Sequence, residues 1–323
     1  MSIAESILAG DTRSLARLLT QVENGLPEGR RSLDELFPHT GRAHLIGVTG
    51  GTGTGKSSLV DRLALHYRRP PSGEPRRVAV VAVDPSSPFT GGAVLGDRVR
   101  MGDLAGDPGV FIRSMASRGS LGGLAQATAA VVQVFDAAGF DPILIETVGA
   151  GQAEVEIARL AHTTLVVEAP GLGDEVQAIK AGILEIADLL VVNKADLPGA
   201  DKTTRALKGM LGLAHPAGRK ASPAWIPPVL RTVALDGTGV DELAESIDRH
   251  AAHLRASGEW ERRERLRLEA ELETRLTAAL SERLRARVGE GHYREALERM
   301  ARREVSPAEA VESLLEREDA ASI

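Results

Sequence analysis

The residues from Gly50 to Ser58 have the spacing of a phosphate-binding loop. They follow a short apolar run, open a stretch with helical periodicity and read Gly50-Gly51-Thr52-Gly53-Thr54-Gly55-Lys56-Ser57-Ser58. The pattern is G-x-x-x-x-G-K-[ST], in which glycines let successive backbone N–H groups turn toward phosphate oxygens. The start of the following helix adds positive potential. Because Lys56 can reach the terminal phosphates and the Ser57 hydroxyl can ligate Mg²⁺, the loop predicts nucleoside triphosphate binding.

Two other structures are compatible with glycines at these positions. One is a glycine-rich turn with an incidental lysine, and the other is the loop of a dinucleotide-binding fold. A dinucleotide loop would not place Lys56 and Ser57 at this point, so the triphosphate interpretation is favoured.

A second motif concerns the base of the nucleotide. Asn193-Lys194-Ala195-Asp196 follows an apolar run and has the N-K-x-D arrangement of GTP-binding proteins. The Asp196 carboxylate can accept from the ring N–H and the exocyclic amine of guanine, a pair of donors that adenine lacks, and Lys194 would lie along the base plane. Four such residues are weak evidence alone, because Asn and Asp are common helix caps. Together with the phosphate loop they predict GTP.

Three acidic residues stand where strands meet loops: Asp84 after the run 78–83, Asp97 in Leu95-Gly96-Asp97-Arg98, and Glu146 after the run 142–145. Ligands of doubly wound sheets lie at the carboxyl ends of strands, so we expect Ser57 and these three carboxylates to hold Mg²⁺. Helix capping is the alternative for Asp84 and Asp97. Glu146 begins a Glu-Thr-Val-Gly segment with the form of a γ-phosphate sensor, in which Gly149 would offer its N–H to the phosphate. The expected catalytic residues are Lys56, Asp97 and Glu146.

Other polar residues carry less information. Arg113, Arg118 and Gln152 could orient water or neutralise charge in a transition state, and ordinary pairing or surface solvation is the alternative for each. The eight histidines show no metal-ligand spacing, and we interpret His44, His66 and His162 as packing or surface residues.

Composition limits the class of protein. The chain of 323 residues has 39 Lys+Arg and 45 Asp+Glu, a formal net charge of −6, whereas a nucleic-acid binder normally carries a basic field. Its 9 aromatic residues offer little stacking surface for bases, and its lack of cysteine removes disulfides and thiolate chemistry. No apolar run approaches the roughly 18 residues of a membrane span. The first residues lack the features of a targeting peptide. We therefore expect a cytoplasmic protein with no nucleic-acid or membrane partner.

Short apolar runs alternate with helical stretches over the middle of the chain. This alternation predicts an α/β fold with a doubly wound, mostly parallel sheet. A helical preface precedes it, with Asp11 as a helix N-cap. The expected divisions are an N-terminal helical extension at 1–40, a nucleotide-binding domain at 41–254 and a C-terminal helical region at 255–323. The expected strands are 45–48, 78–83, 142–145, 164–167, 189–192 and 228–233, and the expected helices include 57–68, 123–137, 176–186 and 201–213.

The C-terminal region carries a stripe of apolar residues at steps of four. Its members are Leu268, Leu272, Leu276, Leu280, Leu284 and Val288. Such a stripe is typical of a helix packed on its own domain or of a dimerisation arm, and the pattern alone does not separate the two.

With these residues assembled, the chain resembles the MeaB/ArgK group of P-loop GTPases, which are chaperones associated with adenosylcobalamin-dependent acyl-CoA mutases. The resemblance extends from about residue 20 to about residue 320. Its motifs are the phosphate loop, 84–92 with 96–98, 113–123, 146–152, and 173–188 continuing into the Asn193 motif.

The resemblance implies a Mg²⁺ site formed by the loop serine, Asp84, Asp97 and Glu146, with GTP or GDP as the bound nucleotide. It implies that the segment around Asp174, Gln177 and Lys180 couples nucleotide state to the mutase, and that the leucine stripe forms a homodimer. The chain departs from the family at the base-contact loop. There Arg231-Thr232-Val233-Ala234-Leu235 stands in place of the usual Ser-Ala pair. The expected base contacts are Val233, Ala234 and Leu235, and the Ala234 N–H could still reach the guanine carbonyl.

The leading hypothesis is thus a Mg²⁺-dependent GTPase, slow without its partner, that gates cofactor loading and protects a mutase such as methylmalonyl-CoA mutase. One alternative is a metallochaperone GTPase, against which the missing cysteines count. Another is a nucleotide-dependent kinase of a transport protein, which would need an ATP preference.

Overall fold

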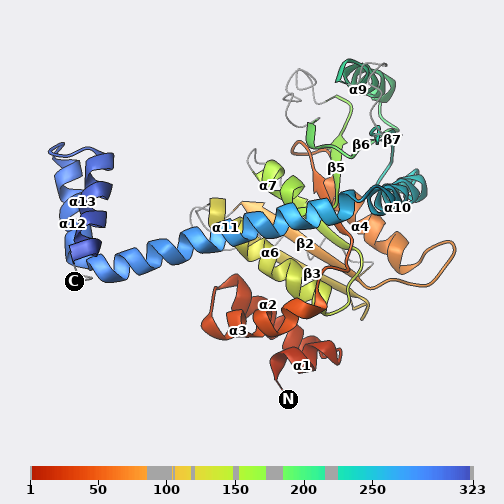
Figure 1. Ribbon diagram of the computed structural model, residues 1–323. Helices are drawn as coiled ribbons and strands as arrows, with labels where there is room; N and C mark the ends of the chain where they lie inside the picture. Colours follow the sequence, from red (N-terminus) through yellow and green to blue (C-terminus); the bar gives the residue numbers. More distant parts are fainter. Residues whose placement is uncertain are drawn as a thin grey trace. The chain divides into compact units, whose positions relative to one another are not determined.

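The structure is a computed structural model. It describes residues 2–85, 104, 106–117, 121–147, 153–171, 185–214 and 225–320. Within these ranges seven strands form one sheet in the order β3-β2-β4-β1-β5-β6-β7, and every neighbouring pair is parallel (Figure 1). The doubly wound α/β prediction is confirmed. The strands are β1 (Leu45–Thr49), β2 (Val78–Pro85), β3 (Val110–Ser117), β4 (Ile143–Thr147), β5 (Thr163–Glu168), β6 (Leu189–Val192) and β7 (Val229–Arg231).

Helices cover both faces of this sheet, which explains why its central strands are apolar at successive positions. Leu45 of β1 faces one layer, whereas Ile46 faces the other. The first layer consists of α1 (Ile3–Leu8), α2 (Thr12–Glu23), α3 (Pro27–Leu36), the short 3₁₀ helix η1 (Phe37–His39), α6 (Leu121–Ala137), α7 (Ala153–Leu160) and α9 (Ala200–Ala214). The second consists of α4 (Lys56–Arg68) and α10 (Val240–Ser257).

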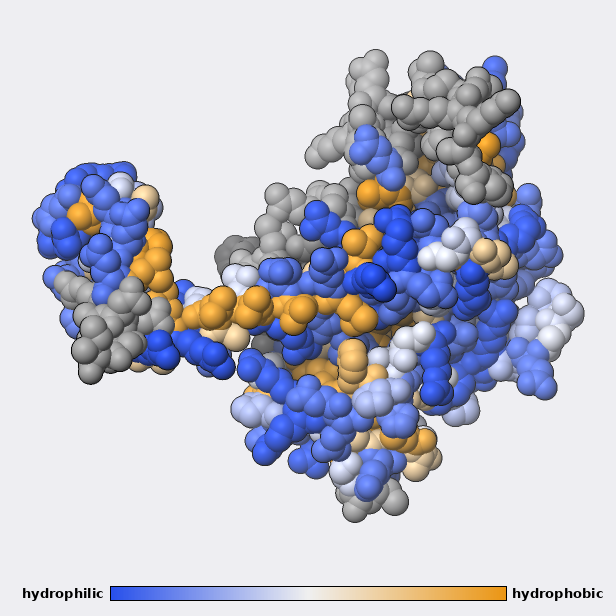
Figure 2. Space-filling model, in the orientation of Figure 1, coloured by the Kyte–Doolittle hydropathy of each residue, from blue (hydrophilic) through white to orange (hydrophobic). Residues whose placement is uncertain are grey.

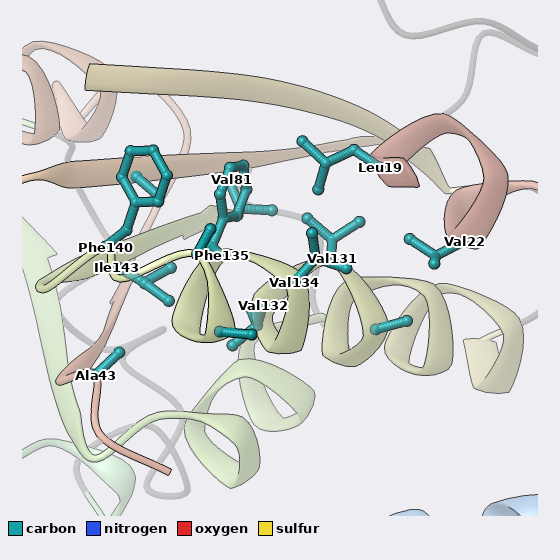
Figure 3. Packing of buried hydrophobic residues seen from close by; sticks show 14 of the residues in the cluster. Leu19, Val22, Ala43, Val81, Val131, Val132, Val134, Phe135, Phe140 and Ile143 are labelled. Carbon is teal, nitrogen blue, oxygen red and sulfur yellow. The ribbon is translucent and has the colours of Figure 1, made fainter. Parts of the chain in front are cut away.

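The core beneath α6 joins the N-terminal helices to the sheet. Figure 3 shows Leu19 and Val22 of α2 beside the buried side chains of α6, with Val81 of β2 nearby. Phe135 and Phe140 pack edge to face with ring centroids 5.4 Å apart. The N-terminal helices are therefore part of the same hydrophobic core as β1 to β4.

The expected N-terminal preface is present, and its cap is as predicted. The Asp11 side chain accepts from the backbone N–H of Ser14 at 2.9 Å and also from that of Arg13, so it closes the start of α2. Glycine at position 10 has φ +89° and separates α1 from α2. α3 was not predicted, although Pro27 stands in its first turn, a favoured place for proline.

The remaining differences concern segments with a weak pattern. β3 was not expected as a strand because polar residues such as Arg113 and Ser114 interrupt its apolar run. The expected strand at 228–233 is shorter, 229–231, and most of the expected helix at 176–186 lies outside the described residues. Expected α4, α6 and α9 agree with the structure to within about two residues, the usual uncertainty of helix ends.

The chain divides into two compact units, Met1–Arg267 and Leu268–Ile323. α11 (Glu259–Val288) begins in the first unit, while α12 (Glu290–Ala301) and α13 (Pro307–Ala320) lie in the second. The expected division at 254 precedes α11, whose first residues lie in the first unit. Figure 2 shows apolar side chains along α11, where Leu268, Leu272, Leu276 and Leu280 are exposed. Among the described helices none is both long and apolar enough to span a bilayer.

Candidate functional site

The phosphate loop connects β1 to α4 and takes its shape from glycine. Gly50, Gly53 and Gly55 have φ values of +139°, +81° and +88°, a region that other L-residues rarely adopt. The buried Lys56 ammonium donates to the carbonyl oxygens of Gly50 at 2.8 Å and Gly51 at 2.9 Å. Because the C=O and N–H of a trans peptide point in opposite directions, these bonds turn the following N–H groups away from Lys56. That arrangement suits a cradle for anions.

The loop lies at the point where the order of the sheet reverses. β1 stands between β4 and β5, and its chain continues to β2 on the far side of β4. Parallel sheets bind ligands at such a point, outside the carboxyl ends of the strands. Glu146 and Thr147 end β4 beside the end of β1, and Glu146 pairs in register with Val48. The sheet therefore brings the phosphate loop and the predicted switch carboxylate together.

Ser57 and Glu146 are in direct contact, although 89 positions separate them in the sequence. The Ser57 hydroxyl donates to Glu146 Oε1 at 2.6 Å, and the Glu146 side chain is buried. A hydroxyl and a carboxylate are oxygen ligands of the kind that Mg²⁺ takes, so this donor set fits the predicted ion. Asp84 lies at the carboxyl end of the adjacent strand β2 by its backbone, and its side chain is outside the described residues.

Several predicted site residues also fall outside the described ranges: Asp97, Gly149, Gln152, Arg118, Asp174, Gln177 and Lys180. In the part of the chain that the structure describes, no group of three or more His, Asp or Glu side chains is placed to hold a metal ion. The two described members of the predicted Mg²⁺ set are Ser57 and Glu146.

Asn193 connects the base motif to the phosphate loop. Its buried side chain donates from Nδ2 to the Thr54 carbonyl at 2.8 Å, and its Oδ1 accepts from Thr232 Oγ1 and Ala234 N, both at 3.1 Å. Lys194 donates to the Gly53 carbonyl at 2.7 Å. The motif after β6 thus holds the phosphate loop on one side and the loop after β7 on the other.

The predicted base-contact residues occupy a tight turn after β7. Val233 and Thr238 form an antiparallel bridge that closes it, and Ala234 is buried whereas Leu235 is 79% exposed. In this structure the Ala234 N–H, expected to reach the guanine carbonyl, donates to Asn193. Asp196 is exposed in the motif that follows β6, and the N–H of its neighbour Ala195 donates to the Thr232 carbonyl at 3.0 Å, next to this turn.

Two residues of this region were missed by sequence reasoning. Thr232 contributes a hydroxyl to Asn193, and Arg62 of α4 donates to the carbonyls of Ala234 and Leu235. Neither belongs to a short motif, and Arg62 is 172 positions from Ala234. A contact of this kind follows from packing between α4 and the turn, which no local pattern indicates.

Arg113 forms an ordinary ion pair, which was the alternative to a catalytic role. It extends from β3 toward α2, where it forms an ion pair with Glu23 and lies 3.4 Å from the Thr20 hydroxyl. It is therefore paired with the N-terminal helices in this structure. His66 of α4 bonds to Asp241 of α10 at 2.7 Å, which agrees with a packing or surface role.

Several buried groups with displaced pKa values lie at the opposite end of the sheet, where the strands begin. Burial lowers the pKa of His44 well below its ordinary value, and Thr163 Oγ1 lies 2.7 Å from its Nε2. Burial alone would raise the pKa of Asp188, but the His250 ring, 3.3 Å away, and hydrogen bonds from Arg263 hold it at about 2. We call His44, His162, Asp188, His250, Arg263 and Glu264 the basal network. It ties α10 and the first turns of α11 to the sheet.

Comparison with known proteins finds a matching family and several relatives. The family model described as "Methylmalonyl Co-A mutase-associated GTPase MeaB" matches residues 15–289. A protein of Pyrococcus abyssi (strain GE5 / Orsay) whose name contains the word GTPase is 44% identical over 313 residues, covering 97% of this chain and 95% of its own length. GTPase ArgK of Escherichia coli (strain K12) is 39% identical over 265 residues, 80% of this chain and 78% of its own. A crystal structure described as LAO/AO transport system kinase matches with a TM-score of 0.71 at 28% identity, covering 97% of this chain and 95% of that one.

Proposed function

This chain belongs to the methylmalonyl-CoA mutase-associated GTPase family, MeaB, and is a GTPase; we propose that it is a Mg²⁺-dependent chaperone of an adenosylcobalamin-dependent acyl-CoA mutase in the cytoplasm. The match to the family over residues 15–289 carries this proposal. Methylmalonyl-CoA mutase or a close relative is the proposed partner. The chaperone would gate cofactor loading into the mutase and protect it during turnover.

The geometry of the site supports hydrolysis by positioning and charge compensation. Lys56 would leave its two loop carbonyls for the terminal phosphates of GTP, and the loop N–H groups would bind the remaining oxygens. Ser57, Asp84, Asp97 and Glu146 would hold Mg²⁺. When bound, the ion would neutralise charge that develops between the β- and γ-phosphates. Asp196 would accept hydrogen bonds from guanine. Asn193 would hold the phosphate loop and the turn after β7 together through its bonds to Thr54 and Ala234.

Slow turnover of the isolated chain is part of the proposal. Arg113, a candidate for stabilising transition-state charge, is paired with Glu23 on α2 instead. An arginine supplied in cis or by a partner accelerates comparable reactions by about 10³–10⁵. We therefore expect the rate without the mutase to lie far below the roughly 10 s⁻¹ of an average enzyme.

The exposed face of α11 supports a homodimer. Leu272 is 65% exposed and Leu280 is 55% exposed, and both belong to the stripe at steps of four. Aligned leucines on a long helix gain free energy when a second copy covers them, about 1.5–3 kcal/mol for each side chain fully buried. We propose that the two copies meet through this stripe.

The test combines the purified chain with mutases that act on methylmalonyl-CoA, isobutyryl-CoA or hydroxyisobutyryl-CoA. We expect one of them to co-elute with the chain and a non-hydrolysable GTP analogue, to lose activity more slowly when GTP is present, and to accept adenosylcobalamin from solution in a GTP-dependent way. Lys56→Ala should reduce GTP hydrolysis by about 10²–10³ and abolish the protection. Lys202→Ala, on the exposed surface of α9, is the matched control. No co-elution with any of the three mutases would contradict the proposal.

One observation favours a second candidate. The crystal structure that matches this chain over 97% of its length is described as a transport system kinase. A kinase would transfer the γ-phosphate of ATP to a protein. Comparing GTP with ATP binding separates the candidates, because the predicted contacts of Asp196 favour guanine.

A further inference from the structure

Arg62 lies in the second turn of α4, the helix that the phosphate loop opens. Its guanidinium donates from Nε to the Ala234 carbonyl at 3.0 Å and from Nη2 to the Leu235 carbonyl at 2.7 Å. Two donors of one rigid fork therefore hold two successive carbonyls of the turn after β7. The helix that begins at Lys56 and Ser57 is bonded in this way to the turn predicted to contact the base.

The amides of this turn are oriented from two sides. Asn193 Oδ1 accepts from the Ala234 N–H at 3.1 Å, which fixes the first amide. Arg62 fixes the Ala234 carbonyl, and because the C=O and N–H of a trans peptide point in opposite directions, it turns the Leu235 N–H away from α4. The Leu235 side chain is 79% exposed, so its own packing does not fix this orientation. The two N–H groups next to the base motif thus depend on Asn193 and Arg62.

We propose that Arg62 is a positioning residue for guanine selectivity: through the Ala234 carbonyl it orients the Leu235 N–H toward the guanine oxygen, beside the Ala234 N–H that Asn193 holds. The proposal rests on the guanine site proposed above and adds a residue outside the N-K-x-D motif. It also makes recognition of the base depend on α4, so that the phosphate loop and the base-contact turn move as one unit.

The test uses an analogue that changes only the guanine oxygen. In 6-thio-GDP a sulfur, which is a weak acceptor, replaces that oxygen, while the donors predicted to meet Asp196 remain. Titration calorimetry with Mg²⁺ should show that the wild-type chain binds GDP more tightly than 6-thio-GDP. In Arg62→Ala the affinity for GDP should fall by about tenfold, which corresponds to the free energy of one hydrogen bond from an oriented donor. The ratio of GDP affinity to 6-thio-GDP affinity should fall toward one.

Three controls keep the result specific. Affinity for inorganic pyrophosphate should not change in Arg62→Ala, because the phosphate loop keeps its own bonds. Arg69→Ala removes an exposed arginine at the end of the same helix and should behave as wild type. Arg62→Lys keeps the positive charge but carries its donors on one nitrogen, without the planar fork, so its ratio of GDP to 6-thio-GDP affinity should lie between those of wild type and Arg62→Ala. If Arg62→Ala does not fold, Arg62→Lys provides the test.

Several outcomes would overturn the inference. An unchanged ratio in both Arg62 variants, or an equal loss of GDP and pyrophosphate affinity, would show that Arg62 does not act through the guanine oxygen. Equal affinity of the wild-type chain for GDP and 6-thio-GDP would show that the turn does not read that oxygen. A wild-type chain that binds ADP as tightly as GDP would instead overturn the guanine site itself.

Discussion

The side-chain amide of Asn193 donates to the carbonyl of Thr54 at 2.8 Å, and this bond joins the two halves of the nucleotide site. Gly55 makes the approach possible. A Cβ at Gly55 would lie 2.5 Å from Asn193 Nδ2, and the residue has φ +88°. The loop glycine is therefore required for contact with the base motif as well as for its own turn.

Gly55→Ala should destabilise the chain more than Gly53→Ala in the absence of nucleotide. Both positions have positive φ, which costs an alanine about 1–2 kcal/mol, but only Gly55 has an atom in the way of the new methyl group. Displacing the buried Asn193 amide should add about 1–3 kcal/mol. Urea unfolding of the two variants measures the difference. Equal free energies of unfolding would show that Asn193 moves aside without cost.

Asp196→Ala should remove the preference for guanine. The wild-type site should prefer a non-hydrolysable GTP analogue over the ATP analogue, because unpaired polar groups in such a site discriminate by up to about 10⁴–10⁵. The variant should bring the two affinities within about tenfold while retaining affinity for the phosphates. Isothermal titration with Mg²⁺ measures both. Glu242→Ala, an exposed carboxylate of α10, should leave the preference intact, and a persistent preference in Asp196→Ala would rule out the assigned role.

Much of the fold is predictable from the sequence because the sheet is covered on both faces. Strands such as 189–192 are apolar at each position, and the pattern locates them to the residue. The same pattern does not predict β3. β3 is an edge strand, and its Arg113 forms an ion pair with Glu23 of α2. Because that partner lies far away in the sequence, no local pattern indicates that a strand can contain this arginine.

Some parts of the site can likewise be predicted from short motifs, whereas others depend on contacts between distant segments. The phosphate loop and the N-K-x-D motif are local, since each of their functional groups projects from one short segment. The contact of Ser57 with Glu146 follows from strand order, which the alternation of strands and helices predicts only in outline. Arg62 could not be found, because its role depends on which face of α4 meets the turn after β7.

The free energy of unfolding should fall as the pH is lowered from about 6.5 toward 5, and His44 should contribute to that fall. Burial lowers the pKa of His44 in the folded chain, whereas the unfolded imidazole takes up a proton near pH 6.5. The unfolded state then binds more protons, so stability decreases as pH falls, by up to about 1.4 kcal/mol per pH unit for one group. Asp188, with a pKa of about 2, loses its stabilising contribution at lower pH, below its ordinary value of 3.8.

Urea unfolding of His44→Gln between pH 7.5 and 5 tests this origin. The amide can still bond to Thr163, and the dependence on pH should become shallower. Burial also lowers the pKa of His162, so some dependence should remain. His39→Gln removes an exposed imidazole from η1 and should match wild type. A dependence that is equally steep in His44→Gln would assign the effect to other groups.

Arg263→Ala should cost far more stability than Arg262→Ala, although the two residues are neighbours on α11. Arg263 donates to both oxygens of Asp188, at 2.8 and 2.9 Å, and to the His162 carbonyl at 2.7 Å. Removing it leaves a buried carboxylate without its guanidinium, a change of about 3–5 kcal/mol. Arg262 pairs with Glu259 on the exposed face, where such a pair contributes about 0–1 kcal/mol. Chemical denaturation gives both values, and similar losses would mean that the basal network does not anchor α11.

The leucine stripe of α11 should decide the oligomeric state. Leu272 is 65% exposed and Leu276 is 48% exposed in the single chain, and the proposed dimer covers both. Replacing both with glutamate places charges in that interface and removes about 1.5–3 kcal/mol per buried leucine, which raises the dissociation constant by at least about a hundredfold. Light scattering after gel filtration should give twice the chain mass for wild type and a single chain mass for the double variant. Arg283→Ala, exposed on the same helix, should stay dimeric, and a double variant that also stays dimeric would place the interface elsewhere.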